Sequence, residues 1–337
     1  MKFNLNSKAF TRSLARVALG IGAIVACMGA LSSNADAQAW PAKPVTIVSP
    51  YPAGGITDLL SRIVGEQLAK SLGQPVLVED RPGAGGAIAM TMVAKAAPDG
   101  YTLVMGGSAP STIVPALNAH VTYDPVKDFE PVAYVAALPI VLVVHPSIPA
   151  TNLKEFVAYA RANSSKLNCG HHGVGTGTHL SCVLFAKAIG AKITDVAYKG
   201  APQVNSDLLS NRVQFYFGTL PTEIGYVRAG QLRALGVASA ARVAPAPDIP
   251  TLDEQGLHGL NMDTWNALFA PAGTPKPVVA RLSGDIAKIL QMPEVRKKIE
   301  ATGSVMQEIG PEQLGKLTKD GFESFRALGA EMNIHLD

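Results

Sequence analysis

Two glycine-rich segments have the composition of anion-binding turns. The first covers residues 50–58 (PYPAGGITD) and leads from a strand-like run at 45–48 into a segment with helical periodicity. Glycine lets backbone amides approach a ligand closely, and the free N–H groups and dipole at a helix start favour a negative charge. The segment therefore predicts an anion site, although Thr57 or Asp58 could cap the helix and leave only an ordinary tight turn.

The second segment covers residues 170–179 (GHHGVGTGTH) and adds hydroxyls and imidazoles to the same strand-to-helix pattern. A third loop, at 106–110 (GGSAP), follows a predicted strand and should open on the edge where ligands bind in open α/β sheets. A diacid could meet one helix start from each of the first two segments, which would supply hydrogen bonds for charges that are costly to desolvate. The candidate ligand-binding residues are Tyr51, Ala53, Gly54, Gly55, Thr57, Asp58, Gly107, Ser108, Ala109, His171, His172, Gly173, Thr176, Gly177, Thr178 and Thr219.

The sequence lacks the patterns of common catalytic and metal sites. The spacing of His171, His172 and His179 matches no zinc motif. Ser108 lies outside the Gly-x-Ser-x-Gly turn of hydrolases, and residues 83–86 lack dinucleotide-binding spacing. We therefore expect no catalytic residue, no metal and no cofactor, and an enzyme is the least favoured hypothesis.

Strand-like and helical runs alternate along the chain. Strands are predicted at 45–48, 76–78 and 102–105, with a helix carrying Leu59 to Leu68 and another at 87–96. The order restarts after Pro139, with strands at 140–144, 167–169, 213–217 and 234–237 and helices at 153–162 and 178–189. This alternation predicts an α/β fold with mainly parallel sheets flanked by helices, and the restart predicts two similar lobes. Helices predicted at 278–291 and 311–332 are expected to return to the first lobe.

The N-terminus has the pattern of a bacterial secretion signal. Four basic residues precede an apolar run at 17–31, and small residues follow at Ala35 and Ala37. We expect residues 1–37 to be removed; a lipoprotein box ending at Cys27 is the less favoured alternative. Cleavage removes four basic residues and one acid, so the net charge of +3 falls to about zero. The mature chain is therefore expected to be soluble and to bind no nucleic acid.

Cys169 and Cys182 are the two cysteines that follow the predicted signal. A disulfide is possible in an oxidising compartment, provided that the Cα atoms lie within about 7 Å. Two buried thiols are the preferred interpretation of this pair.

The chain resembles the substrate-binding proteins of tripartite tricarboxylate transporters, the Bug-type receptors. The resemblance spans essentially the whole mature chain. It is carried by 51–55 (YPAGG) with Asp58, 79–86 (EDRPGAGG), 98–103 (PDGYTL), 128–132 (DFEPV), 173–176 (GVGT) with His179 and Leu180, 198–200 (YKG), 250–251 (PT) with Glu254 and Gly256, and Trp265 before 270–275 (APAGTP).

The resemblance implies a two-lobed periplasmic binding protein of the Venus-flytrap type. It implies a first lobe from 39–140 plus 262–337 and a second from 141–261. It also implies that one ligand carboxylate is held by the loops at 53–58 and 106–109, partly through ordered water. Relatives commonly have Tyr-Gly-Ser-Ser or Tyr-Gly-Ser-Pro where this chain has CGHH at 169–172. Our hypothesis is that His171 or His172 donates to the far end of an extended diacid, with terephthalate as one candidate; a histidine bonded to the backbone at the rim is the alternative.

The function implied is that of a monomeric periplasmic receptor. It would capture a small carboxylate, with a dicarboxylate preferred, and deliver it to the membrane permease subunits of a tripartite tricarboxylate transporter. The alternative is a periplasmic sensor that presents the same ligand to a signalling partner, because both roles require the same closed surface.

Overall fold

The computed structural model describes residues 40–336, apart from the side chain of Asp263. The chain from Lys43 onward forms one compact unit. The predicted signal at 1–37 and the alternative lipidation site at Cys27 lie outside the described residues. Among the helices of the described part, none has the length and apolar character needed to cross a membrane.

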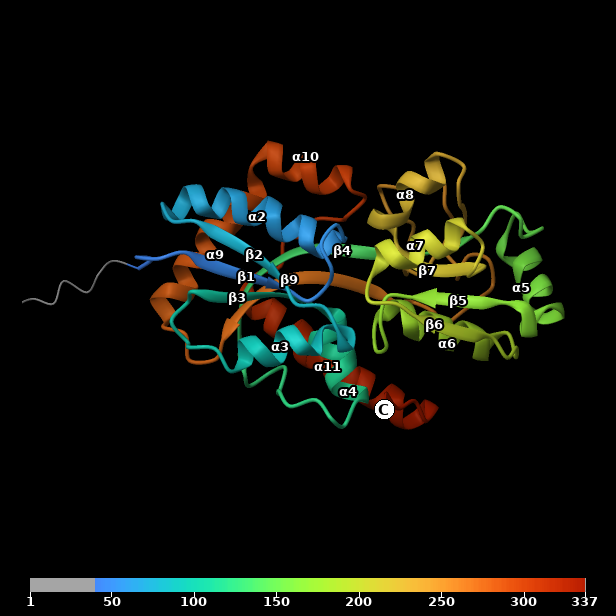
Figure 1. The fold of residues 1–337 in the computed structure, drawn as a ribbon, viewed down its shortest axis with the longest axis horizontal. Helices are drawn as coiled ribbons and strands as arrows, with labels where there is room; N and C mark the ends of the chain where they lie inside the picture. Colours follow the sequence, from blue (N-terminus) through green and yellow to red (C-terminus); the bar gives the residue numbers. More distant parts are fainter. Residues whose placement is uncertain (1–39, 337) are drawn as a thin grey trace, which may run out of the picture. The chain divides into compact units, whose positions relative to one another are not determined.

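The first lobe is built on a sheet that contains the first three strands of the described chain and its last strand (Figure 1). Its strands are β1 (Val45–Ser49), β2 (Val76–Asp80), β3 (Thr102–Gly107), β9 (Asp263–Pro271) and the first half of β4 (Phe129–Val144). Its helices are α2 (Ile56–Leu72), η1 (Ala84–Gly86), α3 (Ala87–Ala94), η2 (Ala109–Ile113), α4 (Val114–Leu117), α9 (Lys276–Gln291), α10 (Pro293–Ala301) and α11 (Pro311–Met332). Strand β1 pairs in parallel with β2 and β3, whereas β9 is antiparallel to both β3 and β4.

The second lobe is built on the other half of β4. Its remaining strands are β5 (Asn168–His171), β6 (Thr194–Ala197), β7 (Phe215–Thr219) and β8 (Arg233–Val237). Its helices are α5 (Leu153–Ala162), η3 (Ser164–Lys166), α6 (Gly177–Ala188), α7 (Ala201–Leu209) and α8 (Leu220–Arg228). Strand β5 is parallel to β6 and β7, while β4 pairs antiparallel with β7 and β8.

Strand β4 is shared by the two lobes. Its first part pairs with β9 as far as Pro139, and its last five residues, from Ile140, pair with β7 and β8. The strands therefore form one path in the order β2-β1-β3-β9-β4-β7-β5-β6, with β8 also on β4. The predicted α/β fold is confirmed, and the sheet is mixed because β4 and β9 run against their neighbours.

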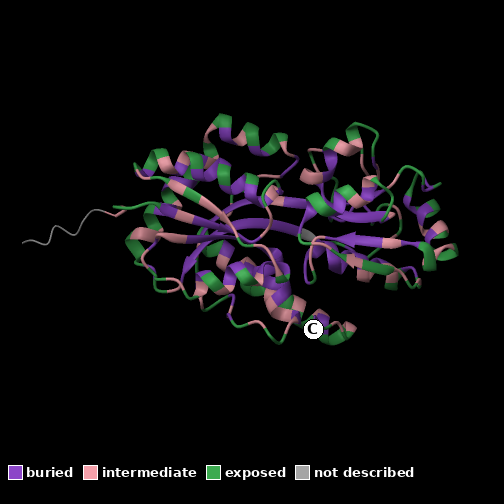
Figure 2. Ribbon diagram, in the orientation of Figure 1, coloured by how far each residue is buried: buried purple, intermediate pink, exposed green. Residues whose placement is uncertain are grey.

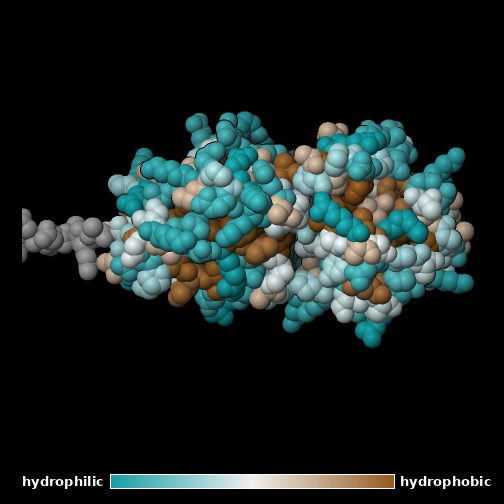
Figure 3. All heavy atoms as spheres, turned by 90° about the horizontal axis from the view of Figure 1, so that it is seen from above, coloured by the Kyte–Doolittle hydropathy of each residue, from teal (hydrophilic) through white to brown (hydrophobic). Residues whose placement is uncertain are grey.

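The strands are apolar in sequence because most of their residues are buried. In Figure 2 the strands form a mostly buried layer, and the helices that flank it expose their outer faces. In the second lobe, the rings of Phe156, Phe185 and Phe215 pack with centroids 5.2–5.7 Å apart. The face in Figure 3 is largely hydrophilic, with hydrophobic atoms visible between the polar side chains.

Cys169 in β5 and Cys182 in α6 form a disulfide, with Cα atoms 6.1 Å apart. The expectation of two free thiols was therefore wrong. The reason is local, because the turn after β5 folds α6 back along that strand. Residues separated by 13 positions then lie within the range that a disulfide can span.

Candidate functional site

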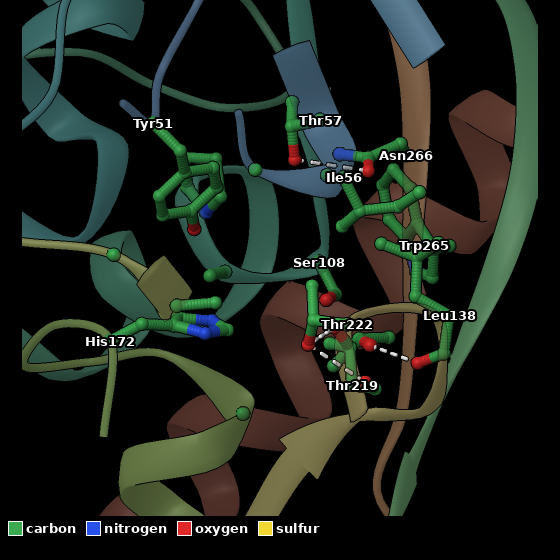
Figure 4. A pocket seen from close by; sticks show the side chains of 18 of the residues that line it. Tyr51, Ile56, Thr57, Ser108, Leu138, His172, Thr219, Thr222, Trp265 and Asn266 are labelled. Carbon is green, nitrogen blue, oxygen red and sulfur yellow. Dashed lines mark hydrogen bonds between the residues drawn. The ribbon is translucent and has the colours of Figure 1, made fainter. Parts of the chain in front are cut away.

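A pocket that opens to solvent lies between the turns of the two lobes (Figure 4). In Figure 4 Tyr51 and His172 lie on one side of it, and Ile56, Leu138 and Trp265 on the other. It is lined by Tyr51, Pro52, Gly55, Ile56, Thr57, Gly107, Ser108, Ala109, Pro110, Leu138, His172, Gly177, Gly200, Ala201, Pro202, Thr219, Thr222, Thr264, Trp265 and Asn266. None of these described lining residues carries a carboxylate, ammonium or guanidinium group.

Four helices begin at this pocket. Residues at the starts of α2, α6, α7 and α8 all belong to its lining. Only α6 is capped by a side chain, since Thr176 accepts the N–H of His179 at 3.2 Å. Helices α2, α7 and α8 start at Gly55, Gly200 and Thr219 without a side-chain cap bond. The first N–H groups of a helix have no partner inside it, so three uncapped starts offer donors to an anion.

Close backbone packing shapes the wall formed by β3 and β9. Gly107 pairs with Asn266 across these strands, and a Cβ on Gly107 would lie 2.4 Å from the carbonyl oxygen of Trp265. Only glycine fits this approach. The contact brings Asn266 next to α2, where its Oδ1 accepts the Thr57 hydroxyl at 3.2 Å.

The imidazole of His172 provides the polar group on the second-lobe side. Its Nδ1 lies 2.9 Å from the hydroxyl of Tyr216, and its ring packs edge-on against Tyr51 at 5.6 Å. Desolvation by burial, followed by the nearby His171, lowers the pKa of His172 to about 3. The ring is therefore neutral at physiological pH. A neutral imidazole has one donor and one acceptor nitrogen, so Nε2 offers a donor where Nδ1 accepts from Tyr216 and an acceptor where Nδ1 donates to it.

The structure places His171 outside the pocket, contrary to the prediction. His171 is fully buried, and its Nε2 lies 3.2 Å from Oδ2 of Asp195 on the neighbouring strand β6. The hypothesis of a histidine that reaches the ligand therefore rests on His172 alone. The physical reason is the alternation of the chain at the end of β5: His171 is its last residue and reaches Asp195, whereas the next side chain, His172, reaches Tyr216.

His171, His179 and Asp195 form a cluster whose donor atoms lie within 4.8 Å of one another. Gly175 donates its N–H to Nδ1 of His179 at 3.2 Å, so in the neutral ring the proton resides on Nε2. That Nε2 lies 3.7 Å from Asp195. The His171 hydrogen bond is the main cause that lowers the pKa of Asp195. This geometry fits a carboxylate bonded to His171 with the His179 imidazole nearby, because His179 offers no lone pair toward the position of a metal.

The other predicted residues divide into two groups. Tyr51, Gly55, Thr57, Gly107, Ser108, Ala109, His172, Gly177 and Thr219 line the pocket. Ala53, Gly54, Asp58, His171, Gly173, Thr176 and Thr178 are not among its lining residues. Asp58 instead accepts the N–H of Gly54 at 3.0 Å and pairs with Arg62 at 2.6 Å, so it shapes the turn. Thr178 accepts the N–H of His172 at 3.3 Å.

Sequence reasoning missed the start of α7 as part of the site, and at the start of α8 it found Thr219 but not Thr222. Gly200, Ala201, Pro202 and Thr222 line the pocket, and both helices carry proline in their first turn. Proline at that position is typical of helix starts and was an available signal. Trp265 and Asn266 carried no local signal, since only the pairing of β3 with β9 brings them to Gly107.

Residues 60–334 match the family model of the tripartite tricarboxylate transporter family receptor. The chain belongs to this family. A UPF0065 protein of Bordetella pertussis is 37% identical over 262 residues, covering 78% of this chain and 80% of the relative. BugT of the same organism is 31% identical, covering 96% of this chain and 99% of BugT. The protein is therefore a periplasmic-type solute-binding receptor rather than an enzyme.

Two solved receptors from Rhodopseudomonas palustris share this fold. MatC with bound malate is 33% identical, with a TM-score of 0.82 over 86% of this chain and 99% of MatC. A second protein, solved with adipate, is 31% identical, with a TM-score of 0.84 over 88% of this chain and 99% of that protein. The ligands in those two structures are both dicarboxylates.

Proposed function

We propose that this receptor binds a small carboxylate in the pocket and delivers it to a membrane transporter. One observation carries the proposal: uncapped starts of α2, α7 and α8 converge on a pocket with no charged lining side chain. Aligned backbone N–H groups and helix dipoles stabilise an anion without a cation. The carboxylate is held by these amides and by the hydroxyls of Ser108 and Thr219.

The preferred ligand is a dicarboxylate. Donors come from both lobes, with α2 and the Ser108 turn on one side and α7 and α8 on the other. Ligands with two acidic ends can satisfy both groups, and malate and adipate occupy the two related receptors. The apolar wall of Ile56, Leu138 and Trp265 suits a carbon chain or an aromatic ring between the ends, so terephthalate remains a candidate.

Membership of the family supports the transport role and the periplasmic location that we propose. Its receptors serve tripartite tricarboxylate transporters, so the partners we propose are the large and small membrane subunits of such a permease. We also propose that residues 1–37 direct the chain to the periplasm and are then removed. The lobes close by bending near Pro139 and Leu260, and the closed face docks on the permease.

Ser108→Ala tests the proposed site. Ser108 is buried and lines the pocket, and a hydrogen bond to a charged group contributes roughly 1.5–3 kcal/mol. We therefore expect dissociation constants for malate, adipate or terephthalate, whichever binds the parent protein, to rise about tenfold or more in titration calorimetry. Ser111→Ala is the matched control, because Ser111 is equally buried in the same segment but does not line the pocket. Equal affinity in both variants, or no acid bound by the parent protein, would contradict the proposal.

A further inference from the structure

Glu223 is a buried carboxyl directly behind the pocket. It lies in the first turn of α8 and has no exposed surface. Its Oε1 accepts the hydroxyl of Thr222 at 2.7 Å, and its Oε2 is buried without a hydrogen-bond partner in the described part of the chain. An isolated buried carboxylate is costly in its charged form, so this position favours a protonated carboxyl.

The surroundings of Glu223 contain no compensating cation within the described residues. From β7, Tyr216 and Gly218 pack against it, and a Cβ on Gly218 would lie 2.5 Å from its Cγ. From α7 it meets the amide of Asn205, whose Oδ1 is also buried without a partner in that part of the chain. Tyr216 is the titratable group that faces it, and no described Lys, Arg or His forms an ion pair with it. Burial is the main cause that raises the pKa of Glu223 to about 7, outweighing the hydroxyl of Thr222 and the amide of Asn205.

Thr222 connects this carboxyl to the ligand site. Its hydroxyl lies 2.7 Å from Glu223 Oε1, 2.9 Å from the carbonyl oxygen of Thr219 and 3.0 Å from the hydroxyl of Thr219, and both threonines line the pocket. Thr222 has a single hydroxyl proton, and an ionised Glu223 is the strongest acceptor within its reach. A proton on Glu223 therefore removes the strongest of the acceptors that compete with a ligand for the Thr222 proton. It also removes a negative charge that would repel an anionic ligand.

We propose that Glu223 makes carboxylate binding proton-linked, so that the receptor takes up one proton onto this side chain when it binds its ligand. The inference rests on the proposed function, because it requires an anion in this pocket. The sign follows from reciprocity: if a proton on Glu223 favours the anion, then the anion favours the proton. Below about pH 7 Glu223 is already protonated and affinity should be flat. Above that pH, affinity should fall by up to about tenfold per pH unit.

The test is titration calorimetry with adipate and malate from about pH 6.5 to about pH 8.5, each in phosphate and in Tris. The two buffers have different ionisation enthalpies, so the difference in heat gives the number of protons bound. For the wild-type protein we expect uptake that approaches one proton near pH 8 and a dissociation constant that rises by roughly tenfold between pH 7 and 8.5. Glu223→Gln imitates the protonated carboxyl, so it should abolish the uptake, make the affinity independent of pH, and bind more tightly than wild type at the alkaline end of the range.

The experiment distinguishes a wrong role for Glu223 from a wrong assignment of the binding site. His172→Gln can change affinity but should leave the proton count unchanged, since His172 stays neutral in this range. If an acid binds wild type without proton uptake, or if Glu223→Gln retains the uptake, the role of Glu223 is wrong while the binding site stands. If neither acid binds at any pH, the proposed function fails, and this inference fails with it. The wild-type measurement decides the question even where Glu223→Gln does not fold.

Discussion

Gly200→Val should weaken carboxylate binding at least about a hundredfold and leave the ligand-free fold intact. Gly200 precedes α7 in the second lobe, and a Cβ there would lie 2.7 Å from Cδ of Pro52 in the first lobe. Its φ of 178° is extended backbone that valine also adopts, so the clash arises only across the pocket. A side chain at this point holds the starts of α2 and α7 apart, and several charge-assisted hydrogen bonds are lost together.

The measurement is the dissociation constant of whichever acid binds the wild-type protein, together with the melting temperature of the ligand-free variant. Gly284→Val is the matched control, because Gly284 lies in α9 and a Cβ there would meet no neighbouring atom within 4 Å. We expect the control to bind normally. Unchanged affinity in Gly200→Val would show that the ligand does not require the close approach of these two turns.

Removing the disulfide should lower the free energy of unfolding by about 3 kcal/mol, the typical value for a loop of this size. Cys169 and Cys182 are both buried, so Cys169→Ala with Cys182→Ala introduces no polar group into the core. The double variant should unfold at lower urea concentration than the oxidised wild type. The bridge fastens β5 to α6, the two elements that hold His172 and Gly177 at the pocket.

Wild-type protein unfolded in the presence of dithiothreitol is the control for this prediction. The reductant should shift wild type toward the double variant and leave the double variant unchanged. Free thiols detected in the native oxidised protein, or identical urea midpoints for all samples, would contradict the disulfide and its stabilising role.

Local patterns predicted much of the fold. The helix predicted at 153–162 is α5, and the segment predicted at 311–332 is α11. Both have apolar residues at helical spacing and are long enough for the period to be visible. Helices α7 and α8 have nine residues each, which is too short for a clear period, and they were not predicted. Strand β4 was predicted only from Ile140, although it begins at Phe129, because its first part gains its partner β9 from far along the chain.

The candidate site was also predicted only in part, because local patterns identify some of its residues and long-range pairing supplies the others. Turns that place a glycine-rich strand end before a helix can be recognised locally, and Gly55, Ser108 and Gly177 line the pocket. Asn266 could not be found this way, because it reaches the pocket only through the pairing of β9 with β3, far apart in the sequence. The sequence left open whether His171 or His172 faces the ligand, because the choice depends on tertiary contacts such as that of His171 with Asp195 on β6.

A crystal structure of the receptor grown with the tightest-binding dicarboxylate would test the proposed site most directly. We predict one carboxylate within hydrogen-bond distance, directly or through one water, of backbone N–H groups at the start of α2, and the second carboxylate at the starts of α7 and α8. We also predict no Lys or Arg side chain in contact with either carboxylate. A ligand bound elsewhere, or a carboxylate held in this pocket by a cationic side chain, would contradict anion binding by uncapped helix starts.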